Sequence, residues 1–142
     1  MKTVRELLET KGHSVLTIAD TANTHDAMEL MAKKNVGALI VVAEGRPVGI
    51  LSERDFARKM FVLEKPPRDT IVREVMTSPI VYVRPEQTNE DCMALMTDKR
   101  IRHLPVMEGD KLIGLISIGD LVKDIISEQQ FIIRQLENYI MS

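Results

Sequence analysis

The chain has very little of several residue types that mark common protein classes. It contains one cysteine, Cys92, no tryptophan, two tyrosines and three phenylalanines among 142 residues. A single cysteine excludes a disulfide within the chain, and so few aromatic side chains argue against stacking on the bases of nucleic acids. Cys92 lies among apolar residues at helical spacing in EDCMALM, so we expect a small buried side chain rather than a reactive thiol.

The chain also has little net charge and no long apolar runs. Nineteen basic side chains stand against twenty-one acidic ones, so no large basic field would drive sequence-independent binding to nucleic acid. No apolar run approaches the ~20 residues of a membrane-spanning helix, and the opening MKTVRELLETKG lacks the apolar stretch of a secretory signal. We therefore expect a cytoplasmic protein with no membrane partner, large enough for one compact domain or two very small ones.

An internal repeat organises most of the chain. Residues 17–60 align with residues 82–125 without a gap, and upstream TVREL at Thr3–Leu7 resembles IVREV at Ile71–Val75. Chance similarity in one ungapped register rarely keeps every turn and apolar stripe in step, so we infer a duplication. Ten aligned pairs are identical: Asp26/Asp91, Met28/Met93, Leu30/Leu95, Met31/Met96, Lys34/Lys99, Leu39/Leu104, Val41/Val106, Gly49/Gly114, Ser52/Ser117 and Asp55/Asp120.

Each copy shows the same order of expected elements. Asn23 and Thr88 stand at N-cap positions with an aspartate three residues later, which predicts a capped helix of about ten residues in each copy. The apolar stripes of these helices carry methionines that we expect to fill the core. ALIVV and PVGIL flank AEGR, as LPVM and LIGLI flank EGDK, and such runs around a glycine turn predict hairpins. A further helix is expected to begin at Glu53 and at Ile118.

The resulting β-α-β-β-α unit is too small to cover its own sheet. We therefore expect an α/β (α+β) fold in which two copies pack sheet to sheet about an approximate twofold axis, with two equivalent clefts. EKPPRD, between the copies, carries two prolines and no apolar residue, which is typical of a linker. The expected boundaries are 1–14 for an N-terminal helical segment, 15–63 for repeat 1, 64–78 for a linker and short helix, 79–127 for repeat 2 and 128–142 for a C-terminal helix extension.

The most informative motif is Gly-x-x-Ser-x-x-Asp, which occurs at Gly49–Asp55 and again at Gly114–Asp120. In both copies it joins the last strand to the next helix. The glycine permits close backbone approach, the serine caps the helix, and the aspartate lies near free backbone N–H groups. A carboxylate there can accept two ribose hydroxyls while the helix N-terminus attracts phosphate. Ser-x-x-Asp is also an ordinary capping box without any ligand, but its matched duplication favours a binding site.

Taken together, the tandem pattern over residues 15–126 closely resembles the cystathionine-β-synthase (CBS) domain pair. The resemblance implies a regulatory module that binds an adenosine-containing ligand between the copies. AMP is the first expectation, and ATP, NAD and S-adenosylmethionine are alternatives; no metal is required. It also implies that the motif aspartate holds the ribose with help from the neighbouring serine. These roles would fall on Asp55 with Ser52 and on Asp120 with Ser117.

The two copies differ where the resemblance places the phosphate. RIRHLPV puts Arg102 and His103 just before a strand of the second copy, whereas Gly37 and Ala38 occupy the equivalent positions in the first. In the family, basic residues here often reach the phosphate of a nucleotide whose ribose is held by the aspartate of the other copy. The preferred site therefore combines Asp55 with Arg102 and His103, and Arg54 could add to it. A solvated edge is the alternative interpretation of the two basic residues.

The C-terminal tail supports an alternative function. LVKDIISEQQFIIRQLENYIMS contains neither proline nor glycine, and its apolar residues fall near a 3.6-residue period, which predicts a helix extending beyond the second copy. That stripe would be covered by the chain's own first helix or by a homodimer. A ligand-free structural or interaction module acting through this helix, with an unknown downstream protein target, is the alternative function. Catalysis is not expected, because no nucleophile elbow is present and the serines are helix caps.

Overall fold

The computed structural model describes residues 2–141. These residues form two compact units: one spans Ser14–Tyr82, and the other combines the residues up to His13 with those from Val83 onward. Each unit contains one repeat. The opening residues of the chain therefore belong with the second repeat and not with the first, which follows them directly in sequence.

The unit of the first repeat is built on a three-stranded sheet. Along the chain it contains β1 (Thr17–Ala19), α2 (Thr24–Lys34), β2 (Ala38–Ala43), β3 (Arg46–Ser52) and α3 (Glu53–Leu63). The strand order is β1-β2-β3, with β1 parallel and β3 antiparallel to the central β2. The first four residues of the central strand β2 are buried, so both of its faces lie in the core. The core cluster around it is apolar throughout. The buried members are Ala27, Met31, Leu39, Val41, Leu51, Val72 and Val75.

The segment between the repeats packs onto the first repeat. EKPPRD leads into a 3-10 helix, η1 (Pro67–Asp69), and a short helix, α4 (Val72–Val75). The hydroxyl of Thr24 donates to the Pro67 carbonyl at 2.7 Å, and the Thr24 amide donates to the Thr70 carbonyl at 2.8 Å. The segment is thus more than a connector, because its carbonyls satisfy polar groups at the start of α2.

The unit of the second repeat contains α1 (Val4–Lys11), α5 (Asn89–Lys99), β4 (His103–Glu108), β5 (Lys111–Ser117) and α6 (Ile118–Met141). Strands β4 and β5 form an antiparallel hairpin. A single parallel bridge between Val83 and Val106 takes the place of the pairing between β1 and β2. The first strand of the second copy is therefore reduced to one bridge, which is the main departure from the expected β-α-β-β-α order.

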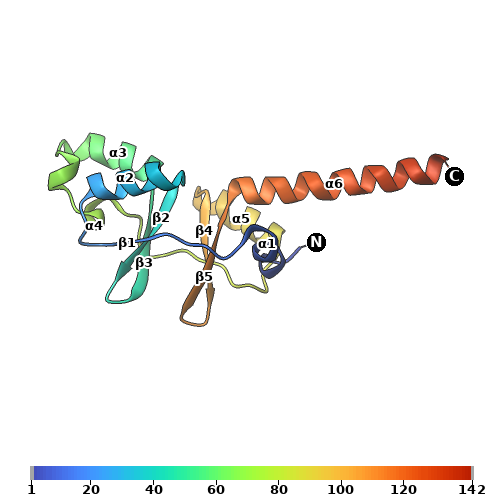
Figure 1. Cartoon of the computed structure of the whole chain (residues 1–142), viewed down its shortest axis with the longest axis horizontal. Helices are drawn as coiled ribbons and strands as arrows, with labels where there is room; N and C mark the ends of the chain where they lie inside the picture. The colour runs from blue at the N-terminus through green and yellow to red at the C-terminus, as the bar shows by residue number, and fades with distance from the viewer. Residues whose placement is uncertain (1, 142) are drawn as a thin grey trace. The chain divides into compact units, whose positions relative to one another are not determined.

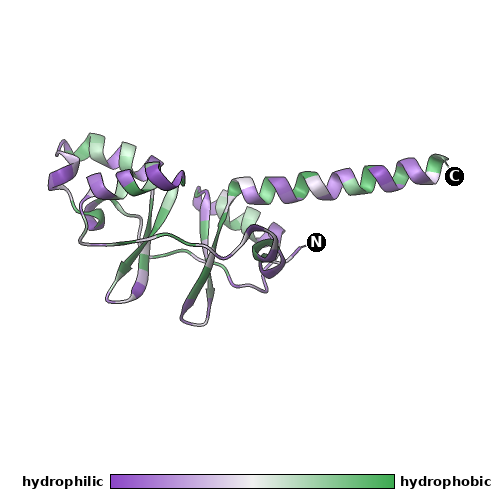
Figure 2. Ribbon diagram, in the orientation of Figure 1, coloured by the Kyte–Doolittle hydropathy of each residue, from purple (hydrophilic) through white to green (hydrophobic). Residues whose placement is uncertain are grey.

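The structure confirms the expected fold class and most of its local detail. Helices α3 and α6 begin at Glu53 and Ile118 as predicted, and α2 and α5 each span 11 residues. Asn23 and Thr88 cap them by accepting from the amides of Asp26 and Asp91 at 2.8 and 3.2 Å. Of the methionines assigned to the core, Met31 and Met96 are almost fully buried, whereas Met28 and Met93 are half-buried. Figure 2 shows apolar and hydrophilic residues alternating along these helices. Pairing of the two copies sheet to sheet stays a prediction.

Helix α1 packs on the second repeat, although it precedes the first in sequence. Figure 1 shows this dark blue helix beside β5, which is drawn in brown. Leu8 is fully buried, and a Cβ atom at Gly114 would lie only 2.6 Å from its Cδ2 atom. A larger residue at position 114 would displace the Leu8 side chain, which lies directly against β5.

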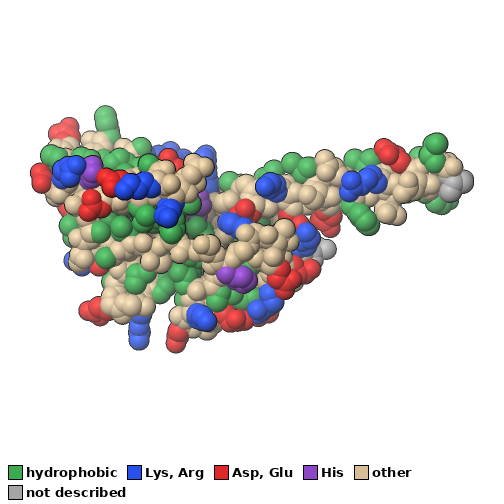
Figure 3. All heavy atoms as spheres, in the orientation of Figure 1, with side chains coloured by type: hydrophobic (Ala, Val, Ile, Leu, Met, Phe, Trp, Pro, Cys, Tyr) green, Lys and Arg blue, Asp and Glu red, His purple; other side chains and the backbone are tan. Residues whose placement is uncertain are grey.

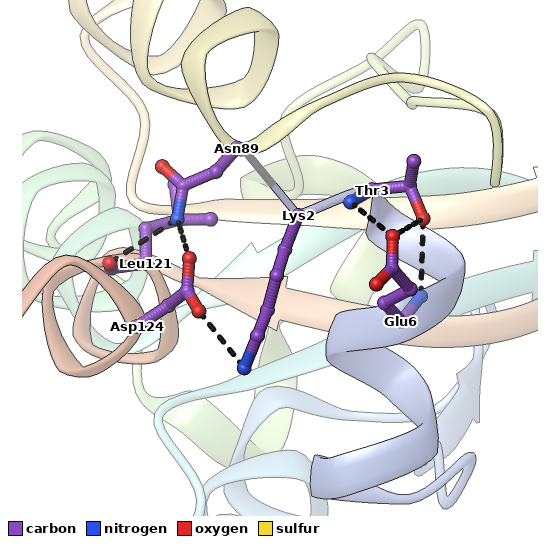
Figure 4. Close-up of polar contacts among 6 residues, drawn as sticks. All are labelled: Lys2, Thr3, Glu6, Asn89, Leu121 and Asp124. Atoms are coloured by element: carbon purple, nitrogen blue, oxygen red, sulfur yellow. Dashed lines mark hydrogen bonds and ion pairs between the residues drawn. The ribbon is translucent and has the colours of Figure 1, made fainter. Parts of the chain in front are cut away.

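A polar network fixes the start of the chain to α5 and α6 (Figure 4). The ammonium of Lys2 lies 3.2 Å from one oxygen of Asp124, and the Asn89 side-chain amide donates to the other oxygen at 2.9 Å. The Asp124 side chain is only 4% exposed. Since a buried carboxylate is stable only when it is paired and hydrogen-bonded, this network ties three segments together.

The last helix extends well past the second repeat, as predicted. Helix α6 has 24 residues, about 36 Å at 1.5 Å per residue. Its first two turns pack on the rest of the unit, with Leu121 and Asp124 buried, whereas the side chains after Ser127 are exposed. The first helix of the chain therefore covers only the start of α6, and the stripe beyond it has no cover among the described residues.

Candidate functional site

In the first repeat, the Gly-x-x-Ser-x-x-Asp motif forms the junction between β3 and α3. A Cβ atom at Gly49 would lie 2.6 Å from the Thr77 carbonyl oxygen, so only glycine lets the two backbones approach this closely. Thr77 and Ile50 exchange backbone hydrogen bonds of 2.9 and 3.0 Å at the same place. Ser52 is the N-cap of α3, and its hydroxyl accepts from the Asp55 amide at 3.1 Å.

The Asp55 carboxylate is half-buried and held from both sides. Its Oδ2 atom accepts from the amide and the hydroxyl of Ser52 at 3.3 and 3.0 Å. Its Oδ1 atom accepts from the Thr77 hydroxyl at 3.1 Å. All three donors are neutral, so Asp55 has no counter-ion among these contacts. An ionised carboxylate has about four acceptor sites, which leaves it capacity for a further donor.

In the second repeat, the equivalent carboxylate is that of Asp120, and it forms an ion pair with Lys11. The Oδ2 atom of Asp120 accepts from the amide and the hydroxyl of Ser117 at 2.8 and 2.9 Å. The Lys11 ammonium donates to the same oxygen at 2.5 Å and to the Leu115 carbonyl at 2.6 Å. Burial raises the pKa of Asp120, but the hydrogen bonds from Lys11 and Ser117 and the Lys11 charge outweigh it, and the pKa falls below its usual value of 3.8. Asp120 is therefore ionised and neutralised within its own unit.

The basic residues predicted to contact phosphate lie beside the second motif. His103 opens β4 and pairs in register with Ser117, and the Ile118 amide donates to the Arg102 carbonyl at 2.9 Å. In the first repeat, Ala38 pairs with Ser52 in the same way, with no basic side chain. Arg102 is exposed and His103 is half-buried.

The predicted site residues thus fall into two groups. The unit of the first repeat brings together Ser52, Arg54 and Asp55, with Arg54 exposed on the first turn of α3. The unit of the second repeat brings together a second group, whose members adjoin the junction of β5 and α6. They are Arg102, His103, Ser117 and Asp120.

Sequence reasoning missed two partners of the motif aspartates, Thr77 and Lys11. Both follow the upstream repeat, Thr77 shortly after IVREV and Lys11 shortly after TVREL. That repeat indicated a helical segment before each copy, and it was the available signal that a further segment contacts the motif. It did not show which copy each helix packs on.

A pocket of about 480 Å³ opens beside Asp120, within the unit of the second repeat. It lies between α1 and the start of α6, and its volume falls in the range of small-molecule sites. Three lysines and two aspartates line it together with small polar and apolar side chains. The lining residues are Lys2, Leu7, Thr10, Lys11, Asp120, Lys123, Asp124 and Ser127.

Residues 2–141 contain no reactive cysteine, no metal site and no helix suited to crossing a membrane. Cys92 is buried in α5, and burial with the nearby charge of Asp91 raises the pKa of its thiol to about 11, so it stays protonated and unreactive. No group of His, Cys, Asp and Glu side chains within that range has the arrangement of a metal site. Nor does any helix in the same range have the length and apolar character needed to cross a membrane.

Comparisons with known proteins agree with this architecture. The model of the CBS domain matches twice, over residues 4–62 and 72–127. The CBS domain-containing protein CBSX3, mitochondrial, of Arabidopsis thaliana is 37% identical over 97% of this chain and 71% of its own length. The crystal structure of the CBS domain protein NE2398 has 54% identity and a TM-score of 0.85, covering 88% of this chain and 98% of that one.

A second solved structure carries a name that refers to function. It is a CBS-domain protein from Burkholderia ambifaria, named for a proposed role in signal transduction, with 47% identity and a TM-score of 0.86. The match covers 90% of this chain and 96% of that one. Two matched domains, the duplicated Gly-x-x-Ser-x-x-Asp junction and these relatives lead to one assignment: the chain belongs to the CBS domain family and consists of a CBS domain pair.

Proposed function

We propose that this CBS pair is a regulatory module that binds an adenosine-containing nucleotide, with AMP preferred over ATP and NAD, and that it is not an enzyme. The observation that carries the proposal is the Asp55 carboxylate at the N-terminus of α3, whose hydrogen-bond donors among residues 2–141 are all neutral. A ribose can displace the Thr77 hydroxyl, which is a neutral donor able to rotate away. The adjacent start of α3 favours an anionic group.

Asp120 is the weaker ribose acceptor in this proposal. Its Oδ2 atom is engaged by the Lys11 ammonium at 2.5 Å, and a charge-assisted bond of this kind is stronger than a bond to a neutral hydroxyl. A ligand at Asp120 would have to compete with Lys11 or bind beside it. The proposal therefore assigns the tighter nucleotide site to Asp55.

Arg102 and His103 are proposed to bind the phosphate of the nucleotide held by Asp55. Their exposed or half-exposed positions at the start of β4 are compatible with this role, and Arg54 on α3 is proposed to assist. The convergence of these residues on one ligand stays a prediction of the family resemblance. Each charge-assisted bond to phosphate contributes ~1.5–3 kcal/mol, so losing both basic residues should weaken AMP about a hundredfold or more.

Isothermal titration of AMP, ATP and NAD into the wild type and Asp55→Asn tests the site. We expect Asp55→Asn to weaken AMP at least tenfold and Asp120→Asn to weaken it less. Because Asp55 also caps α3, Asp91→Asn is the matched control: Asp91 has the same capping-box role at α5 and lies outside the motif. Equal AMP affinity in the wild type and Asp55→Asn would remove the proposed site.

The ribose contact has its own test. A buried carboxylate left without its hydroxyl partner is penalised, so 2′-deoxy-AMP should bind the wild type measurably more weakly than AMP. The difference should disappear in Asp55→Asn. An undiminished preference for AMP in that variant would place the ribose elsewhere.

A ligand-free interaction module is the second candidate, and the exposed apolar side chains of α6 favour it. It predicts no thermal shift with any adenosine compound. Under either candidate we propose that the output is the regulation of another protein or of the chain's own assembly. A cytoplasmic location is also only proposed, since the name of the Arabidopsis relative places that protein in mitochondria.

A further inference from the structure

The exposed part of α6 carries many large apolar side chains, which is unusual for a helix that is surrounded by solvent. Figure 3 shows hydrophobic side chains along this helix, and Figure 2 shows apolar bands repeating to its end. Nine large apolar side chains on the helix are between 42% and 84% exposed, and so much exposed apolar surface marks an interaction surface. They are Val122, Ile126, Phe131, Ile132, Ile133, Leu136, Tyr139, Ile140 and Met141.

Six positions on α6 follow the spacing of a coiled-coil seam, which we call the α6 seam. Ile126, Ile133 and Ile140 are seven residues apart and take the a positions, and the d positions between them alternate at steps of four and three. Five of the six side chains are apolar. The d positions are Val122, Gln129 and Leu136.

The α6 seam lies on a side of the helix that the rest of its unit leaves open. Leu121 and Asp124 are buried, and Asp124 contacts Asn89 of α5 and Lys2 ahead of α1. Val122 and Ile126, in contrast, are 42% and 51% exposed. At 100° per residue, the buried pair points away from the seam. A partner helix can therefore reach the seam along its whole length.

The α6 seam is complementary to the same seam on a second copy that runs antiparallel to it. In an antiparallel pair, each a residue of one helix packs against a d residue of the other. With the centre at residue 131, Ile126 faces Leu136 of the second copy, Val122 faces its Ile140, and Gln129 faces its Ile133. Every layer then pairs an a with a d position, and both helices are used from residue 122 to residue 140.

The charges beside the α6 seam decide between antiparallel and parallel pairing. The e positions are Lys123, Gln130 and Glu137, and in the antiparallel register Lys123 of each helix faces Glu137 of the other. The g positions, Ile125, Ile132 and Tyr139, then face one another on the opposite edge. In a parallel pair, e positions face g positions, so Glu137 would lie against Ile132 and neither ion pair could form.

We propose that a second copy of this chain covers the α6 seam, with the two α6 helices paired antiparallel. We assign a second copy as the partner because one antiparallel register satisfies three features together. These are the a and d positions of the seam, the edge with Lys123 and Glu137, and the apolar edge of g positions. This pairing involves only α6 and holds whether or not a nucleotide binds, so its test is independent of the proposed function.

Sedimentation equilibrium of the full chain tests the pairing. The wild type should self-associate, and Ile133→Asp should be monomeric, because it buries a charge in two layers of the seam. Ile133 is 53% exposed within the unit, so the variant should keep its fold, which circular dichroism checks. A monomeric wild type, or association that survives Ile133→Asp, would overturn the proposal.

Charge reversal tests the orientation. Lys123→Glu or Glu137→Lys alone turns two attractive contacts into two repulsive ones and should weaken self-association about tenfold. The double variant restores both pairs and should return to the wild-type affinity. Arg134→Glu is the matched control, since it changes the charge equally at a position off the seam and should have no effect. Failure of the double variant to recover would refute the antiparallel register.

Discussion

Replacing Lys2 by methionine should destabilise the unit of the second repeat, because it removes the cation beside the Asp124 carboxylate. The two groups lie 3.2 Å apart, with the Asp124 side chain 4% and the Lys2 side chain 47% exposed. Removing one partner of a fully buried pair costs 3–5 kcal/mol, whereas an exposed pair contributes about 0–1 kcal/mol. Since water can partly replace the half-exposed ammonium, and Asn89 still donates to Asp124, we expect a loss of about 1–2 kcal/mol.

Urea denaturation followed by circular dichroism measures this loss. The matched control is Lys33→Met, which removes the same charge from an exposed pair with Glu29 one helical turn away. That pair should contribute ~0.2–0.5 kcal/mol at most. Adding Asp124→Asn to Lys2→Met removes the unpaired charge and should recover part of the stability. If Lys2→Met loses no more than Lys33→Met, the Lys2 contact is not what stabilises the buried carboxylate.

Two further predictions concern the motif junctions. Gly49→Ala should lower the free energy of unfolding by about 1–3 kcal/mol in urea denaturation, because its Cβ atom would lie 2.6 Å from the Thr77 carbonyl oxygen; wild-type stability would mean that this approach is not tight. Lys11→Met should lose about 1 kcal/mol at neutral pH. Because Lys11 lowers the folded-state pKa of Asp120, its contribution is present above pH ~3.8 and is lost as the pH falls below that value. The difference between Lys11→Met and the wild type should therefore narrow from pH 7 to pH 3, and a constant difference would contradict this account.

The parts of the fold that depend on local pattern could be predicted from the sequence. Asn23 and Thr88 cap their helices, and the two hairpins and the starts of α3 and α6 fall at the expected residues, because capping and alternation act over a few positions. The serine and aspartate of each motif bond as a capping box for the same reason. Their duplication made them visible in sequence.

The rest depended on contacts between distant segments. Nothing near Leu8 or Lys11 indicates that α1 would pack against Gly114 and Asp120, more than a hundred residues later in the chain. Thr77 reaches Asp55 only because α4 returns to the first repeat. The Lys11 counter-ion of Asp120 follows from these contacts. The sequence distinguished the two copies by Arg102 and His103, but nothing in it indicated this second difference.

The attachment of the first helix to the last repeat sets an order of events during synthesis. Residues 2–11 leave the ribosome about a hundred residues before the groups that receive them, which lie between Gly114 and Asp124. Domains generally fold as units while the chain emerges from the N-terminus. The first repeat can thus fold before the second has been made, whereas α1 can dock only after β5 and the start of α6 have been synthesised.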